Sequence, residues 1–131
     1  MLKKFFNKKF AYITNKQIIQ KVNEGFAEND TEKIMRYVAD DVRWDVMGAS
    51  IAVGKDAFLR EVNNEHFVGM PCIKIKNEIE QKDWVAVEGE VQCTTKDGGM
   101  LDAFFFDIYR LENGKIKEMR SYIIEKNKSF Y

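Results

Sequence analysis

A change of hydrophobic period at Pro71, the only proline of the chain, constrains the fold more than any other feature. Before Pro71, apolar residues recur at helical spacing. After it they alternate with charged residues, as in Ile73, Lys74 and Ile75. A period near 3.6 indicates an amphipathic helix, whereas strict alternation is typical of a half-buried strand. The sequence therefore predicts helices first and an antiparallel sheet last, which is the α+β class.

Three helices are predicted before this change. The first spans about residues 15–28, with Asn15 as its N-cap, and the second follows the break at Asn29-Asp30-Thr31. The third spans about residues 55–67. A short strand over residues 42–47 separates the second helix from the third, and a loop between two glycines follows that strand.

Turn signals divide the second half of the chain into strands. Lys96-Asp97-Gly98-Gly99 separates a strand over residues 84–95 from one over residues 100–112. Asn113-Gly114 then separates that strand from a last one over residues 115–125. Glycine and asparagine tolerate the backbone angles of tight hairpin turns, so these strands are expected to form an antiparallel meander.

Length and composition limit the domain organisation, the partners and the location that can be expected. Residues 1–14 are predicted to be an N-terminal arm or short helix, and residues 15–131 a single domain. Lysine plus arginine equals aspartate plus glutamate, 21 each, which argues against a nucleic-acid binder. No apolar run approaches the roughly 20 residues of a membrane span, and residues 1–12 lack the apolar segment expected of a secretory signal. Cys72 and Cys93 lack metal-site spacing, so reduced, buried thiols and a cytoplasmic location are predicted.

Asp107 is the most unusual residue of the predicted sheet, because it lies inside FFFDIY, the most aromatic run of the chain. Carboxylates avoid strands and apolar neighbours, since burying an unpaired charge is costly. An acid kept there is either paired for structural reasons, with Arg120 or Tyr122 as candidate partners, or placed for chemistry. Burial would favour the neutral acid, which can donate a hydrogen bond.

Both faces of the strand over residues 100–112 are apolar. Side chains alternate across a strand, so Phe105, Asp107 and Tyr109 share one face, whereas Phe104 and Phe106 share the other. One face is expected to meet the helices. The other is expected to meet a second copy of the chain, which predicts a homodimer.

These segments together resemble the NTF2-like superfamily, within it the SnoaL-like and ketosteroid isomerase-like branch. The resemblance covers about residues 15–125 and is carried by ADDVRWDVMG (39–48), by GKDAF (54–58) opening a helix, and by a meander closing on FDIYRLENGKI (106–116). It implies a cone in which three helices cover the concave face of a curved, mainly antiparallel sheet and enclose an apolar pocket for a small ligand or substrate. It also implies dimers through the convex face of the sheet.

The resemblance further implies a site. Ketosteroid isomerases use an aspartate base with an oxyanion hole made of a tyrosine and a protonated aspartate. Asp45 matches the position of the base, and Asp107 matches that of the protonated aspartate. The tyrosine comes from the first helix, where this chain has Val22. The loss of that donor argues against steroid isomerisation itself.

Further candidates come from the residues themselves. The apolar alternation around Asp45 turns it away from the pocket, toward Arg43, whereas the resemblance turns it inward. His66, near the end of the third predicted helix, is either a surface histidine or a general base, since its ordinary titration lies near neutral pH. Candidate ligand-binding residues, each of which could equally belong to the core, are Trp44, Phe58, Phe67, Trp84, Phe105, Tyr109, Arg120 and Tyr122.

Two functions follow. An isomerase or cyclase acting on an apolar, carbonyl-bearing substrate would move a proton with Asp45 or His66 and stabilise an oxyanion with Asp107, helped by Tyr122 or Arg120. A non-catalytic homodimeric module would use the same pocket for ligand binding, or its convex face for interaction. A second titratable group facing the same cavity as Asp107 would favour the enzyme. The sequence contains no phosphate loop and no metal-ligand spacing, so no nucleotide, metal or other cofactor is predicted.

Overall fold

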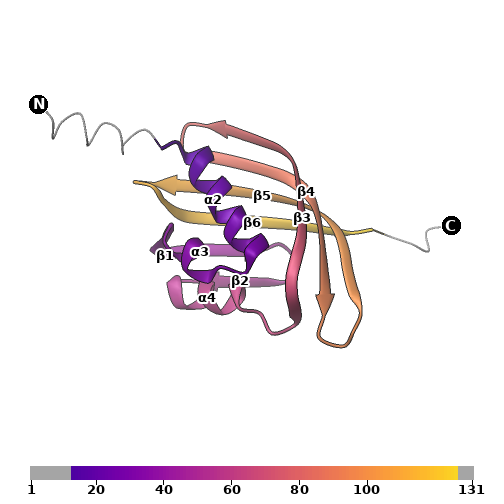
Figure 1. Ribbon diagram of the computed structural model, residues 1–131. Coiled ribbons are helices and arrows are strands. Elements are labelled where there is room, and N and C mark those ends of the chain that lie inside the picture. The colour runs from indigo at the N-terminus through magenta and orange to yellow at the C-terminus, as the bar shows by residue number, and fades with distance from the viewer. Residues whose placement is uncertain (1–12, 127–131) are drawn as a thin grey trace, which may run out of the picture.

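The computed structural model describes residues 13–126, which form a six-stranded sheet with helices on one face (Figure 1). The arm predicted for residues 1–14 lies almost wholly outside the described residues. In chain order the elements are α2 (Asn15–Glu28), α3 (Thr31–Met35), β1 (Val38–Val46), β2 (Ser50–Val53), α4 (Lys55–Val62), β3 (Phe67–Gln81), β4 (Trp84–Thr95), β5 (Met100–Glu112) and β6 (Lys115–Glu125).

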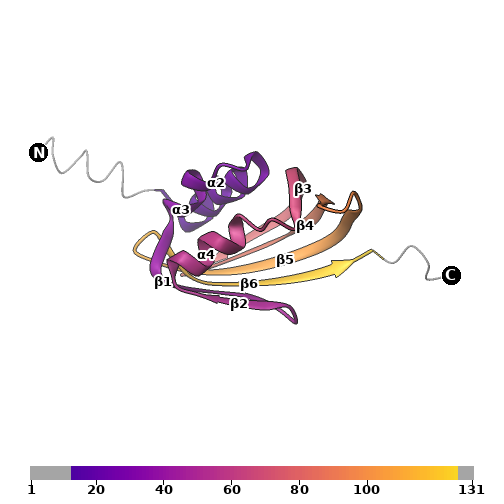
Figure 2. The ribbon, with the colours of Figure 1, turned by 90° about the horizontal axis from the view of Figure 1, so that it is seen from below.

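The strand order in the sheet is β2-β1-β6-β5-β4-β3. All neighbouring strands are antiparallel except β1 and β6, which are parallel. Figure 2 shows that α2, α3 and α4 all lie on the same side of the bent sheet. The α+β class and the mainly antiparallel sheet are thereby confirmed. The helices do not all precede the sheet, however, because α4 follows β1 and β2 in the chain.

Helix α2 is defined by caps at both ends. The Thr14 hydroxyl accepts from the Gln17 backbone N–H at 3.0 Å, and the Gln17 side chain accepts from the Thr14 N–H at 2.8 Å. This capping box makes Thr14 the N-cap, where Asn15 was predicted. Asn29, with φ 54°, ends the helix in the left-handed conformation. Val22, at the place of the isomerase tyrosine, is fully buried in the core.

The predicted limits of β4, β5 and β6 agree with the structure, whereas several earlier elements differ. The segment predicted as a loop between Gly48 and Gly54 contains β2, a strand of four residues that pairs with β1. Strand β1 begins at Val38, earlier than predicted, and β3 begins at Phe67. The third predicted helix is correspondingly shorter, since α4 ends at Val62.

A β-bulge in β6 decides which of its side chains face the helices. Leu111 pairs with Ile116, whereas the preceding Arg110 pairs with Glu118, so Lys117 is an extra residue on β6. An inserted residue shifts the alternation by one position. Downstream of the bulge, the odd-numbered side chains of β6 therefore face the helices, and the even-numbered ones face the convex side.

The core lies between the concave face of the sheet and the helices. Trp44 of β1 packs on Phe58 of α4, with ring centroids 4.8 Å apart, and Tyr109 of β5 is fully buried beneath them. The buried apolar cluster is Ile18, Ile19, Val22, Ile34, Val38, Val42, Trp44, Ala52, Phe58, Val85, Val87, Tyr109, Leu111, Ile116 and Met119.

Gly89 of β4 allows an unusually close approach of its neighbours. A Cβ added there would lie 2.2 Å from the Lys74 carbonyl oxygen and 3.0 Å from the Phe105 ring. Gly89→Ala is therefore expected to lower the free energy of unfolding by about 2 kcal/mol, in the range of overpacking. Urea denaturation measures this, with Gly99→Ala as control, because a Cβ there meets only side-chain oxygens of Thr95 and Asp97. Equal stability of the two variants would contradict the prediction.

Candidate functional site

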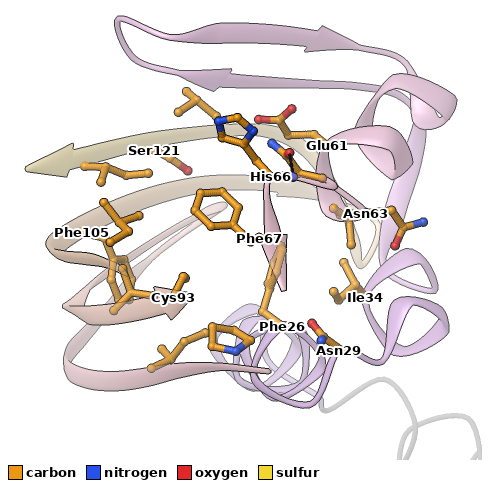
Figure 3. Close-up of a pocket in the computed structure, with 18 of the residues that line it drawn as sticks. Phe26, Asn29, Ile34, Glu61, Asn63, His66, Phe67, Cys93, Phe105 and Ser121 are labelled. Atoms are coloured by element: carbon orange, nitrogen blue, oxygen red, sulfur yellow. Dashed lines mark hydrogen bonds between the residues drawn. The ribbon is translucent and has the colours of Figure 1, made fainter. Parts of the chain in front are cut away.

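A cavity of about 820 Å³ lies between the helices and the concave face of the sheet. Figure 3 shows that its aromatic walls come from different elements: Phe26 from α2, Phe67 from β3 and Phe105 from β5. Trp44 of β1 adds a fourth aromatic side chain. Predominantly apolar walls with a few convergent polar groups are typical of small-molecule sites.

Asp107 is one of those polar groups. It lies on the helix-facing side of β5 and lines the cavity, directly opposite Ser121 of β6. Its surface is half-buried, because one side borders the cavity while protein atoms surround the rest. Burial raises the pKa of the Asp107 carboxyl from its ordinary value of 3.8 to about 7, and hydrogen bonding to Ser121 and Tyr109 opposes this rise. Asp107 can therefore gain or lose a proton near neutral pH.

A short polar chain holds Asp107 in the cavity wall. Ser121 is 3% exposed, and its hydroxyl oxygen accepts a hydrogen bond from the Trp44 indole N–H at 2.9 Å. This contact uses a lone pair of the Ser121 oxygen and not its hydrogen. The Ser121 O–H is therefore still available to donate to the neighbouring Asp107 carboxyl. Tyr109 approaches Asp107 from the same face of β5. Its hydroxyl makes no hydrogen bond of regular geometry among the described residues, yet burial, and next the Asp107 charge, raise the pKa of Tyr109.

His66 lines the same cavity at its exposed mouth. The segment that carries it is fixed by backbone hydrogen bonds: the His66 N–H donates to Asn64 Oδ1 at 2.9 Å, and its carbonyl accepts from the Lys96 N–H at 2.8 Å. The imidazole ring meets the Phe67 ring edge to face, at a centroid distance of 6.1 Å. The structure thus brings Asp107 and His66 to one cavity.

Asp45 lies elsewhere. It follows Trp44 on β1 and belongs to the opposite face of the sheet, where its carboxylate is 3.1 Å from Arg43 Nε. It does not line the cavity. The inward orientation of Asp45 expected from the family resemblance is therefore wrong. The structure has the other predicted orientation, away from the pocket and toward Arg43. From this position Asp45 cannot move a proton within the cavity.

The candidate ligand-binding residues divide into three groups. Trp44, Phe67 and Phe105 line the cavity, whereas Phe58 and Tyr109 are fully buried behind it. The remaining three lie on the convex face, so their predicted place in the pocket wall is wrong: Arg120 stacks on Trp84 at 5.4 Å, and Tyr122 lies beside Phe106. The expected partnership of Arg120 or Tyr122 with Asp107 is excluded by the same geometry, which follows from the bulge in β6.

Sequence analysis missed several lining residues, of which Ser121, Phe26 and Glu61 matter most. Phe26 shares a helix face with the buried residues Ile18, Ile19 and Val22 of α2, and that helical spacing was a usable signal. Ser121 had none, because its alignment with Asp107 depends on the bulge at Lys117.

The thiols and the acidic residues complete the description. Cys93 lines the cavity, and burial raises the pKa of its thiol, which keeps it protonated. Cys72 is exposed, contrary to its predicted burial. Within residues 13–126, no group of three histidine, cysteine, aspartate or glutamate side chains is placed to hold a metal ion. No helix in that range has the length and apolar character needed to cross a bilayer.

Solved structures of NTF2-like proteins have the same fold as this chain. An NTF2-like protein of unknown function from Burkholderia pseudomallei is similar with a TM-score of 0.75 and 20% identity, over 85% of this chain and 92% of that one. An LEH-like epoxide hydrolase from M. tuberculosis is similar with a TM-score of 0.74 and 13% identity, over 83% of this chain and 81% of its own. TerC, co-crystallised with polyporic acid, has a TM-score of 0.71 and 21% identity, over 83% and 90%.

A match to one sequence family is more specific than this likeness in fold. The SnoaL-like domain matches residues 19–119, which is most of the chain, and the protein belongs to this family. No curated protein matches the sequence.

Proposed function

We propose that this protein binds a small apolar molecule in the cavity and transfers a proton on a carbonyl-bearing substrate, as an isomerase or cyclase does. The observation that carries the proposal is the position of Asp107: a carboxyl that titrates near neutral pH faces an aromatic cavity, and no cation of residues 13–126 forms a salt bridge with it. An acid poised near the working pH is suited to general acid–base catalysis.

The catalytic roles of Asp107 and His66 are assigned from their positions, Asp107 inside the cavity and His66 at its mouth. In its protonated form, Asp107 donates a hydrogen bond to the substrate carbonyl and stabilises the oxyanion that forms when an α-proton leaves. Ser121 orients this carboxyl. His66, which lines the same cavity at its mouth, is the second candidate to accept or return a proton. Of the two candidates for proton transfer, Asp45 and His66, this assignment keeps His66, because Asp45 does not line the cavity.

The relatives support a cavity of this kind without specifying the reaction. One similar structure is described as epoxide hydrolase-like and another was crystallised with polyporic acid. At such low identities they share the fold alone, so the reaction is argued from the residues of this chain.

Ligand binding and proton exchange test the proposal. A panel of enones, phenols, steroids and polyketide-like aromatics is screened by thermal shift, and hits with an α-proton are followed by NMR in D₂O for α-proton exchange. We expect wild type to catalyse exchange and Asp107→Ala to lose it by about 100-fold or more, since alanine has no hydrogen-bond donor to stabilise the oxyanion. Asp45→Ala, the same change on the opposite face, is the matched control and keeps full activity. Exchange that survives in Asp107→Ala would contradict the proposal.

A second function, a non-catalytic homodimeric binding or interaction module, is favoured by the convex face. Phe104, Phe106 and Tyr122 are 46%, 40% and 41% exposed there, on neighbouring positions of β5 and β6. Such a contiguous apolar patch marks an interaction surface more often than a bare monomer surface. A second copy of the chain is the occupant that we propose.

A further inference from the structure

The charged side chains that line the cavity are nearly all acidic. Glu61, Glu65 and Asp107 line it, and His66 is the only basic residue among the described lining residues. No lysine or arginine of residues 13–126 lines the cavity. The chain as a whole has equal numbers of acidic and basic residues, so this bias is a property of the cavity rather than of the composition.

We propose that the cavity selects uncharged carbonyl compounds and rejects those that carry a free carboxylate or phosphate. The inference rests on the proposed function of the cavity and names the substrate class for it.

The deep end of the cavity gives the first reason. A ligand anion beside Asp107 would leave water for walls made by Trp44, Phe26 and Phe105, and it would find no cation there. Whenever Asp107 is ionised, the ligand anion would also lie beside a like charge, which is unfavourable. Ser121 could offer a hydroxyl, but that group lies opposite Asp107. A neutral carbonyl oxygen meets none of these costs and accepts a hydrogen bond from Asp107.

The mouth gives the second reason. Glu61 is half-buried there and accepts a hydrogen bond from the Ser50 hydroxyl at 3.2 Å, while Glu65 is exposed next to His66. An anion that approaches this rim meets two carboxylates and a single histidine. The opposing charge acts before the ligand reaches the interior, and it is screened by salt.

Several basic residues of the sheet are engaged in contacts outside the cavity. Lys126 pairs with Glu90 and Asp102, and Arg110 pairs with Glu118 at 2.7 Å. Arg120 stacks on Trp84 on the convex face. None of them lines the cavity, so within residues 13–126 a ligand anion finds no lysine or arginine on the walls.

A consequence concerns the state in which the substrate arrives. A molecule still attached to a phosphate-bearing carrier would bring negative charge to the acidic mouth. The step that supplies the substrate must therefore release it as a free, uncharged molecule, by a reaction that leaves no carboxylate on the part that enters the cavity.

Matched ligands test the inference. The probes are 2-acetylnaphthalene and its 6-carboxamide, 6-aminomethyl and 6-carboxylate derivatives, with dissociation constants measured by calorimetry at pH 7.5. We expect the carboxamide to bind within about 10-fold of the parent ketone, and the carboxylate about 100-fold more weakly than the carboxamide, as for a buried charge left without a partner. The amine, a cation at this pH, is expected to bind more weakly than the carboxamide but more tightly than the carboxylate, because the charged side chains that it meets are acidic. Raising the salt concentration narrows this gap.

Charge variants at the mouth make the test specific. In the double variant Glu61→Gln and Glu65→Gln, the carboxylate is expected to gain about 10-fold in affinity while the carboxamide is unchanged. Glu112→Gln, at the far end of β5, makes the same kind of change away from the cavity and leaves both constants as they are. A carboxylate that binds wild type as tightly as the carboxamide overturns the inference but not the proposed function. Failure of all four probes to bind overturns both.

Discussion

At pH 8 the Asp107→Asn variant is expected to be more stable than wild type by about 2–4 kcal/mol, whereas at pH 4 the two are expected to be nearly equal. The pKa of Asp107 is raised from 3.8 to about 7 by burial. The folded protein therefore holds this proton up to about pH 7, while the unfolded chain releases it near pH 4. The stability that the neutral carboxyl provides is complete below about pH 4 and is lost as the pH rises through 7. Asparagine has no proton to lose.

Urea denaturation between pH 4 and pH 8 measures this difference. Asp83→Asn, which makes the same change at an exposed position in the turn between β3 and β4, is the control and should shift stability little and equally at every pH. A stability difference between wild type and Asp107→Asn that does not vary with pH would show that the folded state holds Asp107 as an ordinary solvated carboxylate. A variant that fails to fold would show that Asp107 is structural.

The pH experiment connects stability with function. An acid that lowers stability at the working pH could be replaced by an isosteric amide to the benefit of the fold. Its presence therefore indicates a role in function, since functional sites often contain destabilising groups. Loss of proton exchange in Asp107→Ala together with a gain of stability in Asp107→Asn would therefore assign this residue to the chemistry of the site rather than to the fold.

Phe106→Asp is expected to convert a homodimer wholly into monomer at micromolar concentration. Phe106 and Tyr122 lie on the convex face with their ring centroids 6.4 Å apart, and both are substantially exposed in the single chain. A dimer that covers this patch would bury the new carboxylate among aromatic side chains, which is strongly unfavourable. Size-exclusion chromatography with light scattering gives the mass directly.

A matched variant separates charge from shape at this position. Phe106→Leu keeps the patch apolar and is expected to remain dimeric, while the fold of both variants is checked by circular dichroism. A wild-type protein that is already monomeric would contradict the proposed dimer. An unchanged mass in Phe106→Asp would place any dimer interface elsewhere.

The sequence predicted the second half of the fold better than the first because its signals are local. The strand limits of β4, β5 and β6 follow from hairpin turns whose residues must adopt left-handed or turn conformations, and Asn113 indeed has φ 52°. Strand β2 has no such signal. It is four residues long, and it exists because β1 offers it a hydrogen-bonding edge, which is a tertiary effect.

The candidate site was predictable in part, for a related reason. Alternation within β5 correctly placed Asp107 with Phe105 and Tyr109, since β5 carries no bulge between them. Alternation within β6 failed for Arg120, because Lys117 interrupts it, and nothing in the amino-acid types announces that interruption. Residue chemistry therefore indicated the site, whereas register decided which partner Asp107 has.

The parallel pairing of β1 with β6 has a consequence for how the chain reaches this fold. Val38 lies beside Ile116, and Trp44 beside Met119, so neighbours in the sheet are separated by most of the domain. Contacts of such long sequence separation form slowly, because a large loop must close before they give any stabilisation. During synthesis, the inner edge of β1 stays open until β6 has left the ribosome. Truncation just before β6 would thus remove the partner of both β1 and β5 and leave two unpaired strand edges, which are the usual starting points of aggregation.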